Sequence, residues 1–123
     1  MQKRSVLLVI DAQNDFMDIT GSPLAVPGAV ADMERLAKFI EKFNPDSIFA
    51  SQDSHYALDI SHPSWWLDHD GKQLPSTGFV PISANDIKNG KFTPRVDPKA
   101  SLAYVEALEA NGEFGHFIWP EHC

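Results

Sequence analysis

The sequence has a single cysteine, Cys123, so one chain cannot form an internal disulfide. Because disulfides are rare in reducing compartments, we expect a cytoplasmic protein. Long apolar runs are also missing, and the longest is Val6 to Ile10. A membrane helix needs roughly 20 apolar residues, so we expect no membrane anchor. This run stops at Asp11, and we therefore expect no signal peptide either.

Positive charge is scarce. The chain has 10 Lys and Arg residues against 17 Asp and Glu residues, for a formal net charge of -7 at pH 7. An acidic chain without a basic cluster is a poor ligand for a phosphate backbone, so we do not expect nucleic acid as a partner. A phosphate-binding glycine loop is also missing, because Gly21 and Gly28 are too far apart to form one.

The composition that remains is that of a globular protein. The chain has 123 residues, of which 43% are hydrophobic and 22% are charged. Such a length favours one domain and allows roughly two-thirds of the unfolded surface to be buried. We therefore expect a single domain over 1–123 with its own hydrophobic core.

The first part of the chain predicts a strand, a helix and a second strand. Residues 5–10 form a continuous β-branched apolar run, typical of a parallel strand covered on both faces. Apolar residues recur at helical spacing over 28–43, with charged residues between them. Residues 48–51 are the second apolar run. This order predicts a βαβ unit.

The segment from about 56 to 96 shows no helical or strand period and is interrupted by prolines and glycines. A stretch of this length without regular structure is unusual, so we expect a functional or folded insertion whose aromatic residues are packed. After it, Asp97 and Pro98 predict the start of a helix and Gly112 its end. Residues 114–119 predict a third strand, and the whole order predicts an α/β sheet.

Polar residues follow the three predicted strands, where the carboxyl ends of parallel strands form a ligand-binding rim. Asp53 and His55 are two residues apart, so an extended segment presents both on one side. With His122 they make a set of two histidines and one carboxylate, which suits Zn, Fe or Mn. A surface Asp-x-His pair with an unrelated histidine fits the same residues. His62 is a further ligand, a group behind the ligands, or an ordinary loop histidine.

Three further residues have alternative interpretations. Asp11 ends a buried strand and can act as a proton acceptor, or it can simply stabilise a turn. Phe16 either lines a pocket or fills the core. His122 and Cys123 do not predict a catalytic pair, because adjacent residues of a strand point to opposite faces. We therefore do not expect Cys123 to be a nucleophile.

Four stretches resemble the nicotinamidase members of the isochorismatase-like cysteine hydrolases. They are VIDAQNDF at 9–16, GSPLAVPGA at 21–29, QDSH at 52–55 and WPEHC at 119–123. The resemblance spans nearly the whole chain, although 56–96 matches only loosely. It implies a three-layer α/β/α fold with a mostly parallel sheet, of which this chain holds the first half.

The resemblance also implies an activity, the hydrolysis of nicotinamide to nicotinate and ammonia. Asp11 matches the catalytic aspartate, which activates a thiol and then a water. The divalent metal, most commonly zinc, would be held by residues that match the family's ligands, namely Asp53, His55 and His122. Phe16 and Trp119 match the aromatic residues that flank the substrate ring.

The chain departs from the family in one respect. The family's catalytic lysine and nucleophilic cysteine follow the WPEHC motif, whereas every lysine here precedes it and Cys123 matches the motif's own cysteine. We therefore expect an N-terminal portion that is inactive alone and whose partners are the missing C-terminal half, a second copy, or both. A related hydrolase for another amide or carbamoyl substrate, and a non-catalytic metal-binding subunit, are the alternatives.

Overall fold

The computed structural model describes residues 4–112 and 114–123. The chain divides into two compact units, one of residues up to Ser54 together with Cys123, the other from His55 to His122. The boundary falls close to the start of the predicted insertion, and the single domain over 1–123 stays a prediction. Within the described ranges, no helix combines the length and the apolar character that crossing a membrane requires.

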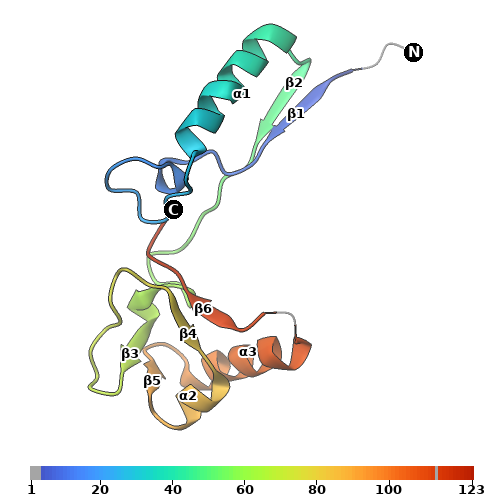
Figure 1. Ribbon diagram of the computed structural model, residues 1–123. Coiled ribbons are helices and arrows are strands. Elements are labelled where there is room, and N and C mark those ends of the chain that lie inside the picture. Colours follow the sequence, from blue (N-terminus) through green and yellow to red (C-terminus); the bar gives the residue numbers. More distant parts are fainter. Residues whose placement is uncertain (1–3, 113) are drawn as a thin grey trace. The chain divides into compact units, whose positions relative to one another are not determined.

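The first unit contains the predicted βαβ motif (Figure 1). Strand β1 (Val6–Val9) pairs in parallel with β2 (Ser47–Ala50), and helix α1 (Ala29–Phe43) connects them. The Asp46 carboxylate accepts hydrogen bonds from the backbone and hydroxyl of Ser5, which holds the two strands in register. A short 3-10 helix, η1 (Asn14–Phe16), follows β1. The prediction for this part of the chain is confirmed.

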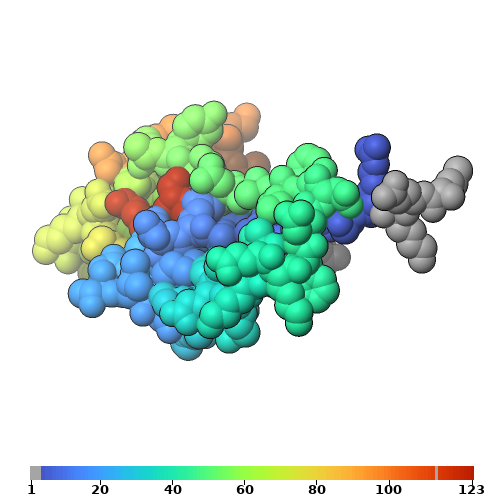
Figure 2. Space-filling model, turned by 90° about the horizontal axis from the view of Figure 1, so that it is seen from above, coloured from blue at the N-terminus to red at the C-terminus, as the bar shows by residue number. Residues whose placement is uncertain are grey.

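The first unit has little buried surface. Leu7 and Val9 are half-buried, whereas Val6 and Leu8 are 64% and 60% exposed. The expectation that β1 is covered on both faces is therefore not met in the described part of the chain. Helix α1 likewise has no fully buried residue, although Met33, Leu36 and Ile40 are half-buried, and part of the helix lies on the face that Figure 2 shows.

The hydrophobic core lies in the second unit. It consists of the following buried side chains: Trp66, Leu74, Ile82, Ala84, Phe92, Val105 and Ile118. Helix α3 (Pro98–Asn111) contributes Val105, which is fully buried. The Asp97 carboxylate caps its first turn by accepting a hydrogen bond from Ala100 N–H, and Gly112 ends it with a φ of 71°. Both helix ends are as the sequence predicts.

The segment 56–96 contains short helices and strands, although its sequence shows no helical or strand period. It contains η2 (Pro63–Trp65), β3 (Trp66–Asp68), β4 (Val80–Ile82), α2 (Ala84–Lys88) and β5 (Phe92–Pro94). Strands of three residues are too short to display an alternating pattern, so the sequence does not show them. The prediction that aromatic residues here are packed holds for Trp66 and Phe92, which are buried in the core, but not for Phe79, which is 55% exposed.

The mixed α/β class is confirmed, but the sheet pairing is more varied than predicted. The predicted strand at 114–119 is β6 (His116–Ile118), and it pairs antiparallel with β4. Strands β3 and β5 are also antiparallel. Parallel pairing in the described chain is confined to β1 and β2.

Candidate metal centre

Three histidines converge in the second unit. His55 is its first residue, His62 immediately precedes η2, and His122 follows β6. The centroid of the His55 ring lies 4.6 Å from that of His62 and 4.8 Å from that of His122. The centroids of the His62 and His122 rings are 5.1 Å apart. One nitrogen from each ring lies within 4.8 Å of the other two, so the three residues can bind one ion.

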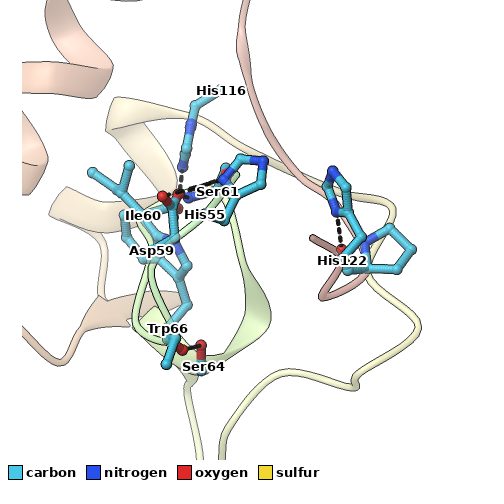
Figure 3. A network of polar contacts seen from close by, with 10 residues as sticks. His55, Asp59, Ile60, Ser61, Ser64, Trp66, His116 and His122 are labelled. Atoms are coloured by element: carbon cyan, nitrogen blue, oxygen red, sulfur yellow. Dashed lines mark hydrogen bonds and ion pairs between the residues drawn. The ribbon is translucent and has the colours of Figure 1, made fainter. Parts of the chain in front are cut away.

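Two of these rings are oriented through Nδ1 (Figure 3). His122 Nδ1 lies 2.6 Å from the Pro120 carbonyl oxygen, and His55 Nδ1 lies 3.3 Å from a carboxylate oxygen of Asp59. Because a carbonyl and a carboxylate can only accept, both Nδ1 atoms carry the hydrogen. A neutral ring in this tautomer has its lone pair on Nε2, which is the form that ligates a metal.

His62 has the most unusual environment of the three. Its side chain is 3% exposed, and among the described residues its Nε2 is buried without a hydrogen-bond partner. Leaving such a group unpaired costs about 1–3 kcal/mol, so a buried orphan nitrogen requires an explanation. A metal ion held with His55 and His122 would supply the missing partner, and the residues therefore fit a metal.

Electrostatics favour the neutral form of His62. Burial lowers the pKa of its imidazole, and the neighbouring His55 and His122 lower it further, against the opposing charges of Asp59 and Glu121. A histidine must be deprotonated to bind a metal, so a lowered pKa favours metal binding by the His62 imidazole over its protonation. Imidazole nitrogens suit Zn, Cu, Fe and Ni, and a three-histidine zinc site leaves a position open for water or substrate.

The structure brings together two of the predicted metal ligands in the second unit. His55 and His122 lie side by side as predicted, and His62 joins them as a full member of the group. Asp53 belongs to the first unit, where Gln13 binds its backbone: Asp53 N–H donates to Gln13 Oε1 at 2.6 Å, and its carbonyl accepts from Gln13 Nε2 at 3.0 Å. Its role as a ligand stays a prediction.

Asp11 and Phe16 line the same cavity of the first unit. This open cavity of about 480 Å³ lies between the end of β1 and the start of α1. Asp11 has a φ of 51°, in the left-handed region that non-glycine residues adopt rarely. Its carboxylate accepts a hydrogen bond from the Ser51 hydroxyl at 2.8 Å. The cavity therefore brings together a carboxylate that can act as a base, Asp11, and an aromatic side chain, Phe16.

Trp119 lies in the second unit, at the end of β6. The residue is 41% exposed, and its ring contacts that of Phe117, with the ring centroids 4.9 Å apart. Its backbone N–H donates to the Ser61 carbonyl at 2.8 Å, which ties the segment before His122 to the turn before His62. Its role in substrate binding stays a prediction.

The environment of Cys123 disfavours a nucleophilic thiol. Burial raises the pKa of the Cys123 thiol, and the negative charges of Asp15 and two other aspartates raise it further. The sulfur also accepts a hydrogen bond from Gln13 Nε2 at 3.0 Å. Because the thiolate is the reactive form, a raised pKa lowers the reactivity of this thiol.

The sequence interpretation assigned no role to Asp59, which contacts His55 in the structure. The only available signal was its position in an Asp-x-Ser turn four residues after His55. His69 and His116 lie outside the group of three: His69 is exposed beside Asp70, and His116 is buried in β6. Comparisons of the chain with family models, with curated proteins and with solved structures found no match.

Proposed function

We propose that this chain carries the metal site and the catalytic base of an amide hydrolase of nicotinamidase type, which converts nicotinamide to nicotinate and ammonia. The observation that carries the proposal is the convergence of His55, His62 and His122 around the buried Nε2 of His62. The family resemblance of the QDSH and WPEHC motifs, which contain two of these histidines, supports the same conclusion.

Zinc is the metal we propose, with iron or manganese as alternatives. When bound, the ion would supply an electrophilic centre for the ring nitrogen of nicotinamide. His55, His62 and His122 would hold it through their Nε2 atoms, while Asp59 and the Pro120 carbonyl hold the rings of His55 and His122 from behind. By resemblance Asp53 is a further ligand. A lone cysteine suits the reducing cytoplasm, where we place the reaction.

Asp11 is the proposed base in the first unit. By resemblance it accepts the proton of a nucleophilic thiol and later that of the hydrolytic water, and Phe16 contacts the substrate ring. The two residues line one cavity, which supports these roles. The resemblance assigns the thiol and the catalytic lysine to residues that follow the WPEHC motif, and the raised pKa of the Cys123 thiol supports that assignment.

We also propose that β1 and β2 belong to a larger, mostly parallel sheet of a three-layer α/β/α fold. Parallel strands are normally covered on both faces, whereas Val6, Leu8 and Ile10 are 64%, 60% and 68% exposed in the described chain. The remaining half of such a fold, or a second copy of the chain, would cover this apolar face.

Metal content and ammonia release test the proposal on the full-length protein. We expect one divalent ion per chain, strongly reduced occupancy in His55→Ala, His62→Ala and His122→Ala, and unchanged occupancy in His69→Ala, since His69 is exposed. We expect ammonia release from nicotinamide to be lost in Asp11→Asn. Absence of bound metal would refute the metal site, and a clear preference for another small amide would replace nicotinamide as the substrate.

A further inference from the structure

The Asp59 carboxylate has a different partner on each oxygen. Oδ1 accepts hydrogen bonds from the Ser61 backbone N–H at 2.8 Å and from the Ser61 hydroxyl at 2.6 Å. Oδ2 lies 3.3 Å from Nδ1 of His55 (Figure 3). Ser61 therefore holds the carboxylate in one orientation, with its second oxygen facing the imidazole.

We propose that Asp59 is a positioning residue of the metal centre, which keeps His55 in the Nδ1–H tautomer and directs its Nε2 toward His62 and His122. The inference rests on the proposed function, because it requires that the three histidines bind an ion. A carboxylate behind a ligating histidine fixes the ring and raises its basicity, and removing such a partner typically costs about 10–100-fold in metal affinity.

The surroundings of this pair distinguish it from an ordinary surface contact. The His55 and Asp59 side chains are 22% and 23% exposed, so solvent screens their interaction only in part. A comparable pair, His69 and Asp70, has a separation of 3.4 Å, but its side chains are 74% and 57% exposed. The second pair therefore provides an internal reference for a histidine–carboxylate contact without a positioning role.

The turn that contains Asp59 also connects the segments of the other two histidines. His62 N–H donates to the Asp59 carbonyl at 3.0 Å, and the Ser61 carbonyl accepts from Trp119 N–H at 2.8 Å, three residues before His122. The backbone of the turn that contains Asp59 is therefore hydrogen-bonded to the segments that carry His62 and His122. A side chain held this firmly can determine the orientation of the ring that it contacts.

The decisive variant is Asp59→Asn. An asparagine has the same shape and keeps an oxygen that accepts from Ser61, but it presents an amide donor to His55 Nδ1 in place of an acceptor. We expect the affinity of the full-length protein for Co²⁺, measured by its visible absorption, to fall about 10–100-fold. Asp70→Asn is the matched control, and its Co²⁺ affinity should equal that of the wild type.

A double-mutant cycle separates positioning from a general structural role. If Asp59 acts through His55, Asp59→Asn should lower Co²⁺ affinity in the wild type and in His122→Ala but have no further effect in His55→Ala. An equal loss in all three backgrounds would mean that Asp59 ligates the ion or supports the fold, and would overturn the inference. So would a Co²⁺ affinity of Asp59→Asn that matches the wild type.

A measurement on the wild type covers the case in which Asp59→Asn does not fold. In the zinc-loaded protein, long-range ¹H–¹⁵N NMR should show a proton on Nδ1 of His55, and an unprotonated Nδ1 would refute the inference. Failure of the proposed function looks different. A wild-type protein that binds no metal would refute both the proposed metal site and the positioning role of Asp59. Metal binding that depends on His55 but not on Asp59 would refute the positioning role alone.

Discussion

Gly78 lies directly against the peptide that joins Trp119 to Pro120, and a Cβ on Gly78 would be 2.3 Å from the Pro120 nitrogen. Side-chain atoms do not tolerate such a distance, and the atoms in the way belong to the backbone, which cannot rotate aside. Gly78 also has a φ of 60°, which favours glycine. This close approach sets the path of the segment that leads to His122.

Gly78→Ala should therefore damage both stability and metal binding. Left-handed backbone costs an alanine roughly 1–2 kcal/mol, and overpacking adds about 1–3 kcal/mol. Gly90→Ala is the control, because Gly90 has a φ of 72° but open space around it, so only the backbone term applies. Urea unfolding and Co²⁺ titration should show a larger stability loss in Gly78→Ala and weaker metal binding in that variant alone. Equal effects would contradict the role of the close approach.

Replacing His62 by leucine should separate stability from function. Leucine removes the buried, unpartnered Nε2, so the metal-free protein should gain about 1 kcal/mol or more in free energy of unfolding. The same change removes a ligand and should weaken Co²⁺ binding. His69→Leu, at an exposed position, should leave Co²⁺ binding as it is. A His62→Leu variant that is less stable without metal and still binds Co²⁺ normally would show that His62 is an ordinary core histidine.

The metal-free protein should lose stability as the pH falls below neutral. Burial is the main cause that lowers the pKa of His116 below its ordinary 6.5, and the same holds for His62. Below about pH 6.5 the unfolded chain takes up protons that the folded chain does not, so the free energy of unfolding falls with decreasing pH until the folded pKa is reached. The slope is at most about 1.4 kcal/mol per pH unit for each histidine.

Unfolding by urea in the presence of a chelator, at several pH values between neutral and acidic, measures this slope. His62→Leu should reduce it, because one of the two buried histidines no longer titrates. A free energy of unfolding that rises on acidification would show that these rings are protonated in the folded protein.

The Cys123 thiol should react slowly with iodoacetamide. Its raised pKa comes from burial first and from the charge of Asp15 next, so Asp15→Asn should increase the alkylation rate at fixed pH. Asp32→Asn, which removes an exposed carboxylate on α1, is the control. Peptide mass spectrometry follows the modification at Cys123, and a fast, pH-independent reaction in the wild type would contradict the raised pKa of this thiol.

The sequence predicted the elements whose signals are local. Asp97, Pro98 and Gly112 mark the ends of α3 because capping and left-handed backbone depend on residue type at single positions. The amphipathic pattern of α1 extends over 15 residues and was equally clear. The strands of three residues in 56–96 were missed, since their existence depends on pairing with segments distant in sequence. The antiparallel partner of β6 was missed for the same reason.

The candidate site shows the same division. His55 and His122 were predicted from motifs, in which residue type and spacing carry the chemistry. For His62 the sequence left three interpretations open, of which metal ligand was one, because a loop histidine before a proline has no distinctive pattern. The sequence provided no indication of a role for Asp59, because the orientation of its carboxylate toward His55 depends on the folded turn and leaves no signal in a single sequence.

By itself the sequence determined the acidic charge, the mixed α/β class, the helix ends and the presence of metal-binding residue types. Only the tertiary structure decided that His62 lies beside His55 and His122 and that the Asp59 carboxylate faces His55. It alone also shows that the Trp119–Pro120 peptide packs directly against Gly78. The physical reason is that composition and caps act within a few residues of the chain. A metal centre, in contrast, depends on the burial and direction of side chains that only long-range packing brings together.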